Sequence, residues 1–317
     1  MRMRRIAALL VGASLVITAA ACSKNNPPST PGTPDKVTAE VIPIVDVAPI
    51  YLGKSKGFFT DVNIDLSLDT AAGGAAIIPG VASGQFQFGF SNAPSLLLAQ
   101  TNGVPVKVVS SGNTATNDPN NDFSGLVVKD PSITSAAQLS GKKVAANTTK
   151  GIVELAIRKL VDMAGGDGTS VNITAIGFPD MVAALDNNQV DAIFEVEPGL
   201  SAAKAKGWHV LGSLATIDPG MTVAMYFTSA NLAQSNPDLV ARFTSAMKKS
   251  LQYASDHPDE ARAIVGTYTQ TPAAVLQSLV LTGWPQDVNT DSLNTLADLM
   301  VQYKFTDKRP DVSAILP

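Results

Sequence analysis

The stretch AEVIPIVDVAPIYLGKSKGFFTDVNIDLSLDTAAGGAAIIPGVASGQFQFGFSNAPSLLLAQTNGVPVKVVS, residues 39–110, alternates short apolar runs with segments of helical character. The runs typical of strands are 41–47, 64–68, 86–90 and 106–109, and the helical segments between them are 49–59, 73–81 and 93–100. Alternation of this kind predicts a parallel sheet whose strands are joined by crossover helices. We therefore expect an α/β fold.

Short groups of polar and small residues follow the first three predicted strands, and each group precedes a helix. The residues on this rim are Asp46 and Ala48 after the first strand, Thr70 after the second, and Ser91, Asn92 and Ala93 after the third. Ligands of open α/β sheets bind beyond the carboxyl ends of the strands, next to the N-termini of the following helices. The sequence therefore predicts a binding site along this rim.

A second α/β series lies between residues 125 and 228. Its predicted strands are 125–129, 142–146, 171–176, 190–196, 208–211 and 223–228. The turn Thr148-Thr149-Lys150 repeats the arrangement around Ser91, in which hydroxyl groups stand between a strand and a helix start. Beyond residue 236 the sequence predicts helices that open at Pro237, Pro258, Pro272 and near Thr290.

Ser91, Asn92, Thr148 and Thr149 are the first candidates for ligand contact. Hydroxyl and amide groups beside the free N–H groups of a helix start bind an anion without a buried countercharge. The alternative is that these side chains only cap their helices. The two roles do not exclude one another, because capping also places the side chains at the rim.

Acidic residues on the rim narrow the kind of ligand that we expect. Asp46 either interacts favourably with a helix dipole or binds an amino group, a hydroxyl or a ring nitrogen. Glu195 and Glu197 end a strand and point to the same side of it, because side chains alternate along a strand. These acids disfavour a bare dianion and favour a zwitterion or a ligand with hydroxyl or amine groups, with Lys150 available to offset their charge.

The N-terminus has the pattern of an export signal. Arg2, Arg4 and Arg5 precede the apolar segment 6–17, small residues occupy 18–21, and Cys22 is the only cysteine of the chain. We expect a signal peptide over 1–21 and lipidation of Cys22, which anchors a domain to a membrane face without a spanning helix. Ordinary secretion with an incidental cysteine is the alternative. Residues 22–36 then hold the lipidated cysteine and a flexible linker rich in Pro, Ser, Thr and Asn.

Composition excludes several classes of function. The chain has 317 residues, 45% hydrophobic content and a net charge of −4, with no basic cluster beyond the first five residues, so nucleic acid is not an expected partner. Its two histidines are far apart and lack partner cysteines, and there is no Gly-rich phosphate loop with a lysine. We expect no metal, no cofactor and no catalytic residues.

Three motifs resemble a known family. APIYLGKSKGFF, GVASGQFQFGFSNAPSLLLAQ and FEVEP resemble the binding proteins of nitrate/sulfonate/taurine-type ABC transporters, a family that includes thiamine-pyrimidine and aromatic-acid binders. The resemblance covers residues 39–310 and implies a two-lobed periplasmic-binding-protein fold of type II. It implies lobe one over 37–125 plus 229–317, lobe two over 126–228, and paired hinge strands near 125–129 and 223–228.

The function implied is capture and delivery. We expect a monomeric, lipid-anchored protein on the extracytoplasmic face that passes a small organic anion or zwitterion to an ABC permease and its ATPase. A sulfonate, taurine or an aromatic acid are the expected ligands, and a thiamine-pyrimidine precursor is the alternative. The same fold resembles a pyrimidine synthase, but that enzyme uses a cysteine-rich motif and a histidine, and the mature chain lacks such a motif. A ligand-sensing module is a third interpretation.

Overall fold

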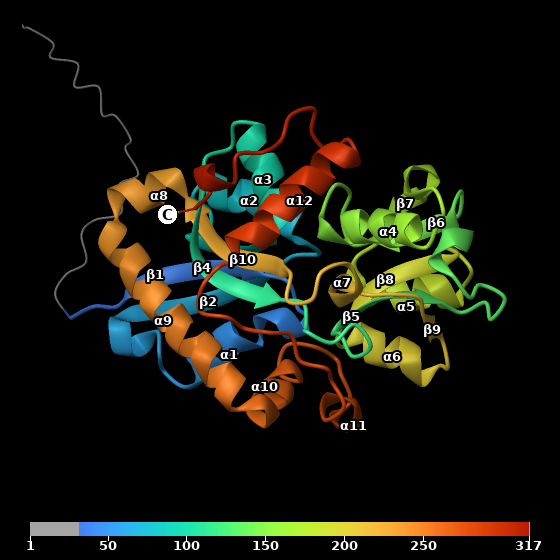
Figure 1. Cartoon of the computed structure of the whole chain (residues 1–317). Helices are drawn as coiled ribbons and strands as arrows, with labels where there is room; N and C mark the ends of the chain where they lie inside the picture. Colours follow the sequence, from blue (N-terminus) through green and yellow to red (C-terminus); the bar gives the residue numbers. More distant parts are fainter. Residues whose placement is uncertain (1–31, 317) are drawn as a thin grey trace, which may run out of the picture. The chain divides into compact units, whose positions relative to one another are not determined.

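Two five-stranded sheets organise the chain (Figure 1). The computed structural model describes residues 32–316, so the expected signal peptide 1–21, Cys22 and the linker up to residue 31 lie outside the described residues. The strand orders are β2-β1-β3-β10-β4 and β7-β6-β8-β5-β9. In each sheet most strands run parallel, and one strand, β10 or β5, runs antiparallel to its neighbours. The α/β expectation is confirmed.

The first lobe comprises the first sheet and its helices. Its strands are β1 (Asp35–Val41), β2 (Ile64–Thr70), β3 (Phe88–Asn92), β4 (Val106–Thr114) and β10 (Thr222–Ser229). Its helices are α1 (Ala48–Ser55), α2 (Gly74–Ala82), α3 (Ala93–Thr101), α8 (Ala230–Ser235), α9 (Pro237–Asp256), α10 (Pro258–Val265), α11 (Ala273–Leu276) and α12 (Thr290–Gln302). Short 3-10 helices are η1 (Val45–Val47), η2 (Thr60–Val62) and η5 (Val312–Ala314).

The second lobe is smaller. Its strands are β5 (Ser124–Val128), β6 (Lys143–Ala146), β7 (Asn172–Ala175), β8 (Ala192–Val196) and β9 (His209–Val210). Its helices are α4 (Ile152–Met163), α5 (Phe178–Asp186), α6 (Gly199–Ala205) and α7 (Leu214–Ile217), with 3-10 helices η3 (Ala136–Leu139) and η4 (Gly168–Ser170). None of the helices within 32–316 has both the length and the apolar character needed to cross a membrane.

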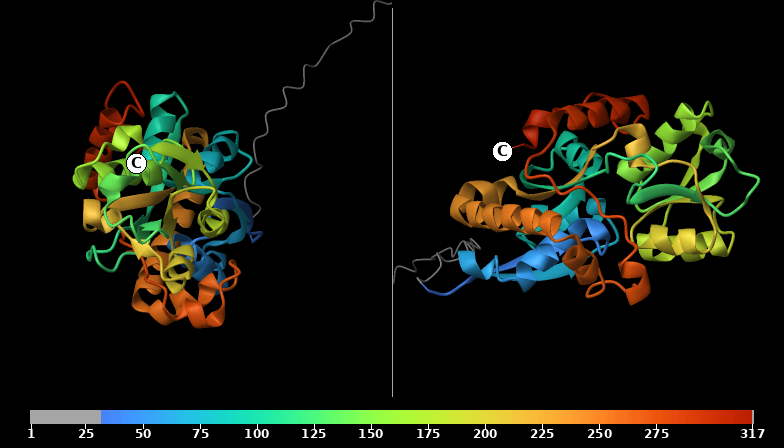
Figure 2. Two further views of the ribbon diagram at one scale, coloured as in Figure 1. Left: turned by 90° about the vertical axis from the view of Figure 1, so that its right-hand side faces the viewer. Right: turned by 60° about the horizontal axis from the view of Figure 1, so that its bottom comes forward.

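Helices cover both faces of the first sheet. Helices α1 and α9 pack together on one face, and α2, α3 and α12 lie on the other (Figures 1 and 2). The alternating phenylalanines of residues 86–90 supply the core: Phe88 is fully buried and stacks on Phe243 of α9 at a centroid distance of 3.7 Å. Helix α9 is therefore held against the first sheet by aromatic packing.

The first strand lies earlier than the apolar pattern predicts. β1 begins at Asp35, whose carboxylate accepts a hydrogen bond from Arg242 Nη2 at 2.6 Å, so the linker expected over 22–36 ends before this residue. The run predicted as a strand over 41–47 contains only the last residue of β1 and then turns into η1. An apolar run shows burial, and burial is common to a strand and to a packed turn.

The two strands expected to pair as hinges do not pair. β5 lies in the second sheet beside β8 and β9, and β10 lies in the first sheet beside β3 and β4. The chain instead crosses between the sheets in two segments, 115–123 and 218–221, joined by hydrogen bonds from Ala115 N to Met221 O and from Gly220 N to Thr116 O. This expectation was wrong because each strand completes the sheet with which it shares side-chain packing. The exact lobe boundaries remain a proposal.

Candidate functional site

A small cavity lies between the two sheets. Its volume is about 30 Å³, far below the roughly 300–1,000 Å³ of typical ligand pockets. It is lined by Ile42, Ile44, Asp46, Phe90, Asn92, Val223 and Ala224 from the first lobe and by Asn147, Ile152, Val153, Phe178, Val196 and Leu214 from the second. The lining is mostly apolar, and polar groups enter it from the carboxyl ends of β3 and β6.

Asp46 is the charged group of this lining. Its side chain is 3% exposed, its Oδ2 accepts a hydrogen bond of 2.7 Å from Asn113 Nδ2, and its Oδ1 has no hydrogen-bond partner among residues 32–316. Burial raises the pKa of Asp46 to about 7, and the hydrogen bond from Asn113 opposes that rise. A carboxylate is thus kept at the edge of an apolar cavity with one oxygen unused.

Asn92 joins the two lobes beside this cavity. Its Oδ1 accepts from Ser95 N at 3.0 Å, which caps α3, and from Ile152 N at 3.3 Å, which belongs to the first turn of α4 in the other lobe. The residue before α4, Gly151, supplies no side-chain cap. An amide oxygen from the first lobe therefore occupies the acceptor position at the start of α4.

Buried hydroxyl groups surround this junction without partners. Ser91 Oγ, Ser95 Oγ and Thr148 Oγ1 make no hydrogen bond in the described part of the chain. A Cβ on Gly151 would lie 2.9 Å from Thr148 Oγ1 and 3.6 Å from both Ser95 Oγ and Asn92 Nδ2. These three side chains therefore surround Gly151. Buried hydroxyls normally find a partner, so these are free to serve an added group.

The other predicted residues lie away from the cavity. Glu195 is buried against the start of α6, where a Cβ on Gly199 would lie 2.5 Å from its carboxyl carbon, and the neighbouring Val196 faces the cavity instead. The Glu197 carboxylate accepts hydrogen bonds from Ser201 N, Ser201 Oγ and Val280 N. Both glutamates are buried, and burial raises the pKa of each.

Six further candidates are placed as follows. Ala48 and Ala93 are buried in the first turns of their helices. Ser91 packs under Gly74 of α2. The exposed candidates are Thr70, Thr149 and Lys150. Of the residues predicted to bind ligand, Asp46 and Asn92 line the cavity itself. Thr148 stands at its edge, next to Asn147.

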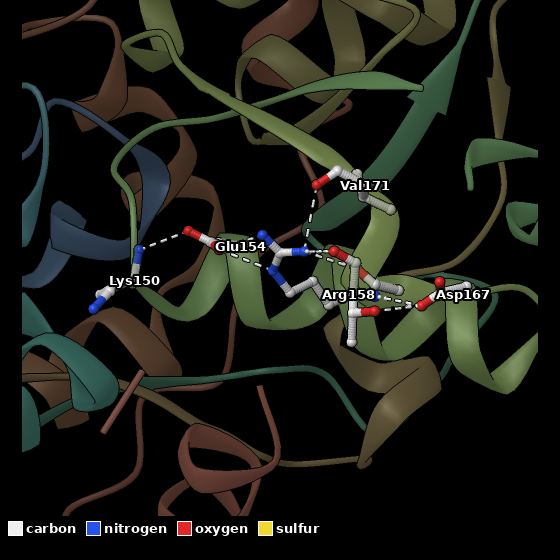
Figure 3. Close-up of polar contacts among 7 residues, drawn as sticks. Lys150, Glu154, Arg158, Asp167 and Val171 are labelled. Atoms are coloured by element: carbon white, nitrogen blue, oxygen red, sulfur yellow. Dashed lines mark hydrogen bonds and ion pairs between the residues drawn. The ribbon is translucent and has the colours of Figure 1, made fainter. Parts of the chain in front are cut away.

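A polar network supports the start of α4 (Figure 3). Glu154 accepts from Lys150 N at 2.7 Å and from Arg158 Nε at 2.8 Å, and Arg158 Nη1 donates to the carbonyls of Gly168, Thr169 and Val171. The sequence predicts a surface pair here, but the Glu154 side chain is 8% exposed. The network holds the turn 148–151 in place through the hydrogen bond from Lys150 N to Glu154.

A larger groove of about 810 Å³ lies between the crossing segment at 116–121 and the loop 277–284. None of the residues predicted to bind ligand lines this groove. Its arginine, Arg262, already donates to Leu279 O and Asp259 Oδ1. We keep the smaller cavity as the candidate site, because unused buried polar atoms gather around it.

Comparison with known proteins agrees with this architecture. The model of the family described as NMT1/THI5 like matches residues 44–261, a region that includes Asp46, Asn92 and Asn147. The chain belongs to this family. Its fold is that of periplasmic binding proteins: it is similar to the alkanesulfonate-binding protein SsuA from Xanthomonas axonopodis pv. citri, solved with bound MOPS, at a TM-score of 0.76 and 16% identity over 90% of this chain and 99% of that chain.

Two curated relatives carry different names. The formylaminopyrimidine-binding protein of Halalkalibacterium halodurans is 23% identical over 69% of this chain and 65% of that protein. The 4-amino-5-hydroxymethyl-2-methylpyrimidine phosphate synthase of Candida albicans is 26% identical over 70% of this chain and 68% of that protein. The matched region thus spans about two thirds of each relative. The resemblance predicted from the three motifs is confirmed for family and fold.

Sequence reasoning missed several groups of this NMT1/THI5-like site. Asn113 lies beyond the predicted strand run 106–109, but it belongs to β4, and its Nδ2 donates to Asp46 Oδ2. Tyr226 is fully buried with an unpartnered hydroxyl and packs against Phe90, which lines the cavity. Both lie far from Asp46 in the chain, and neither stands between a predicted strand and a predicted helix, which was the signal used to find candidates.

Proposed function

We propose that the protein is the extracytoplasmic solute-binding component of an ABC importer, and that it captures a small organic anion or zwitterion between its lobes. The supporting observation is Asn92, whose amide oxygen lies at the starts of α3 and α4 together. Helix N-termini favour an acceptor or an anion. A ligand oxygen that takes over the Ile152 N–H meets the unused hydroxyls of Ser95 and Thr148 as well.

Binding requires the lobes to part. A cavity of about 30 Å³ does not admit an organic solute. Within residues 32–316 the chain crosses between the lobes in two segments, which suits closure by rotation about a hinge. We propose that ligand entry opens the contacts between Asn92 and α4, and that the closed, loaded form is recognised by the permease. We also propose that lipidated Cys22 anchors the protein to the membrane and that it acts as a monomer.

Catalysis is the competing function, favoured by the name of the Candida albicans relative. General acid–base catalysis requires titratable groups within reach of the reacting atoms. Asp46 is the one titratable side chain in the cavity lining of the described chain. We therefore propose binding without reaction. Recovery of an unaltered solute after prolonged incubation, measured by mass spectrometry, supports binding, and a new product supports the enzyme.

The ligand class is tested by a thermal-shift and calorimetric screen of the purified protein with taurine, ethanesulfonate, nitrate, benzoate, 4-aminobenzoate and 4-amino-2-methylpyrimidine. A bound solute raises Tm. For the best solute, we expect the double variant Ser95→Ala, Thr148→Val to lose affinity by roughly 10- to 100-fold, since two hydrogen bonds to an anion are removed. The matched control is Thr134→Val, at an exposed position of the second lobe. Unchanged affinity in the double variant contradicts the site.

A hydrogen bond between the lobes gives a second test. Tyr303 Oη, after α12, donates to Asp162 Oδ2 of α4 at 2.7 Å, and burial and this bond raise the pKa of Tyr303. We expect Tyr303→Phe to shift the ligand-free protein toward an open form by about tenfold. Tyr253→Phe is the control, because Tyr253 Oη donates to Glu260 within the first lobe. Small-angle scattering measures the opening, and equal profiles for the two variants would contradict the role of Tyr303.

A further inference from the structure

We propose that the solute carries an amino group and that the free oxygen of the Asp46 carboxylate, held in place by Asn113, binds it. This inference rests on the proposed function and specifies the end of the solute opposite its acceptor group. In this proposal Asp46 and Asn113 determine which solutes bind. They select an amino compound over an analogue that differs only in lacking that group.

The orientation of Asp46 is the first support. Asn113 Nδ2 donates to Asp46 Oδ2 at 2.7 Å and to Thr282 Oγ1 at 3.0 Å, and Thr282 in turn donates to Thr114 O. Both amide hydrogens of Asn113 are thereby used. The backbone of Asp46 is held as well, because Trp284 Nε1 donates to its carbonyl oxygen at 3.0 Å. Asp46 is therefore held through its Oδ2 and its backbone carbonyl, and its Oδ1 has no hydrogen-bond partner in the described chain.

The absence of a protein countercharge is the second support. No lysine or arginine forms an ion pair with Asp46 in the described chain, and the charged or titratable groups that influence it are Asp122 and the buried tyrosines Tyr226 and Tyr268. A buried carboxylate without a partner is unfavourable. Burial raises the pKa of Asp46, as expected for a buried carboxylate whose Oδ1 accepts no hydrogen bond. An ammonium or amino N–H supplies that donor.

Two more unused atoms belong to the same cluster. Asn113 Oδ1 and Tyr226 Oη have no partner within residues 32–316, and both side chains are fully buried. Asp46 Oδ1 and Asn113 Oδ1 only accept, and the Tyr226 hydroxyl can accept or donate. The hydroxyls of Ser95 and Thr148 and the Ile152 N–H at the start of α4 are donors for the acceptor group of the solute. A plain sulfonate, carboxylate or nitrate accepts from those donors but has no donor for Asp46 Oδ1.

The test uses pairs of probes that differ by one amino group: taurine and ethanesulfonate, 4-aminobenzoate and benzoate, 4-amino-2-methylpyrimidine and 2-methylpyrimidine. Affinities are measured by calorimetry on the full protein. In each pair that binds, we expect the amino member to bind about 100-fold more tightly, because a site built around a buried acceptor rejects an analogue that lacks the donor. Asp46→Asn should remove most of that preference, whereas Asp65→Asn, at an exposed position of β2, should keep it.

The outcomes separate this inference from the proposed function. Equal affinities within the pairs, or a preference that survives in Asp46→Asn, overturn the role of Asp46 and leave the solute-binding function intact. Failure of all six probes to bind overturns the proposed ligand class, and the inference falls with it. Asn113→Leu provides an independent readout: it leaves Asp46 in place without its support and should reduce the preference by about tenfold.

Discussion

Asp46→Asn should make the ligand-free protein more stable at pH 8, by about 2–4 kcal/mol. Burial raises the pKa of Asp46 from 3.8 to about 7 in the folded protein. The folded state therefore holds a proton between these pH values that the unfolded state releases. The stability of the native sequence then falls as pH rises from about 4 to 7, and the loss is complete above pH 7.

The neutral amide removes this dependence. Near pH 4 the native protein and Asp46→Asn should have the same free energy of unfolding, and the difference should grow up to pH 7 and then stay constant. Comparing the two proteins cancels the contributions of Glu195 and Glu197, which are buried in both. Urea unfolding at pH 4, 5, 6, 7 and 8 measures the effect. A difference that is absent at pH 8, or that grows toward low pH, contradicts the buried charge.

Loss of stability is the second large effect, expected for Arg158→Met. Its guanidinium donates to Glu154 and to three backbone carbonyls, and the side chains of Arg158 and Glu154 are 15% and 8% exposed (Figure 3). Removing one partner of a buried ion pair leaves the other charge uncompensated, which costs about 3–5 kcal/mol. At about 2–4 °C per kcal/mol for a protein of this size, we expect Tm to fall by about 6–20 °C.

A double variant and a matched control make this prediction specific. Adding Glu154→Gln to Arg158→Met removes the stranded charge and should restore part of the lost stability. Arg309→Met breaks a pair with Asp298 whose side chains are 45% and 65% exposed, and exposed pairs contribute about 1 kcal/mol or less. Calorimetric melting of the four proteins gives the comparison. Equal losses at Arg158 and Arg309 would show that the network near α4 is not buried in solution.

Local pattern predicted most of the helices and strands. Helices open at Pro237, Pro258 and Thr290 as expected, because proline and a preceding polar cap determine a helix start within a few residues. Ser135 and Gln138 form a capping box, another start signal that is visible in the sequence. The pairing of segments 125–129 and 223–228 was wrong, since strand pairing depends on residues far apart in the chain.

In the candidate site, too, the sequence predicts local positions but not contacts between distant segments. Asp46 and Asn92 were found because they follow strands, and that position is visible in the sequence. Glu195 and Glu197 also end a strand, but their side chains pack on α6 and the loop near Val280, since the face that a strand turns to the cavity depends on its place in the sheet. The sequence predicts the residues of the rim, but it does not show which of them face the cavity and which pack against neighbouring segments.

The sequence by itself determined the family, the α/β class and the rim on which polar groups gather, because short-range patterns of apolar residues, caps and prolines carry that information. Only the tertiary structure decided that Asn92 accepts from the start of α4, sixty residues away, and that Asn113 holds Asp46. Hydrogen bonds between distant segments leave no periodic pattern in the chain. The charge and specificity of the site depend on those bonds.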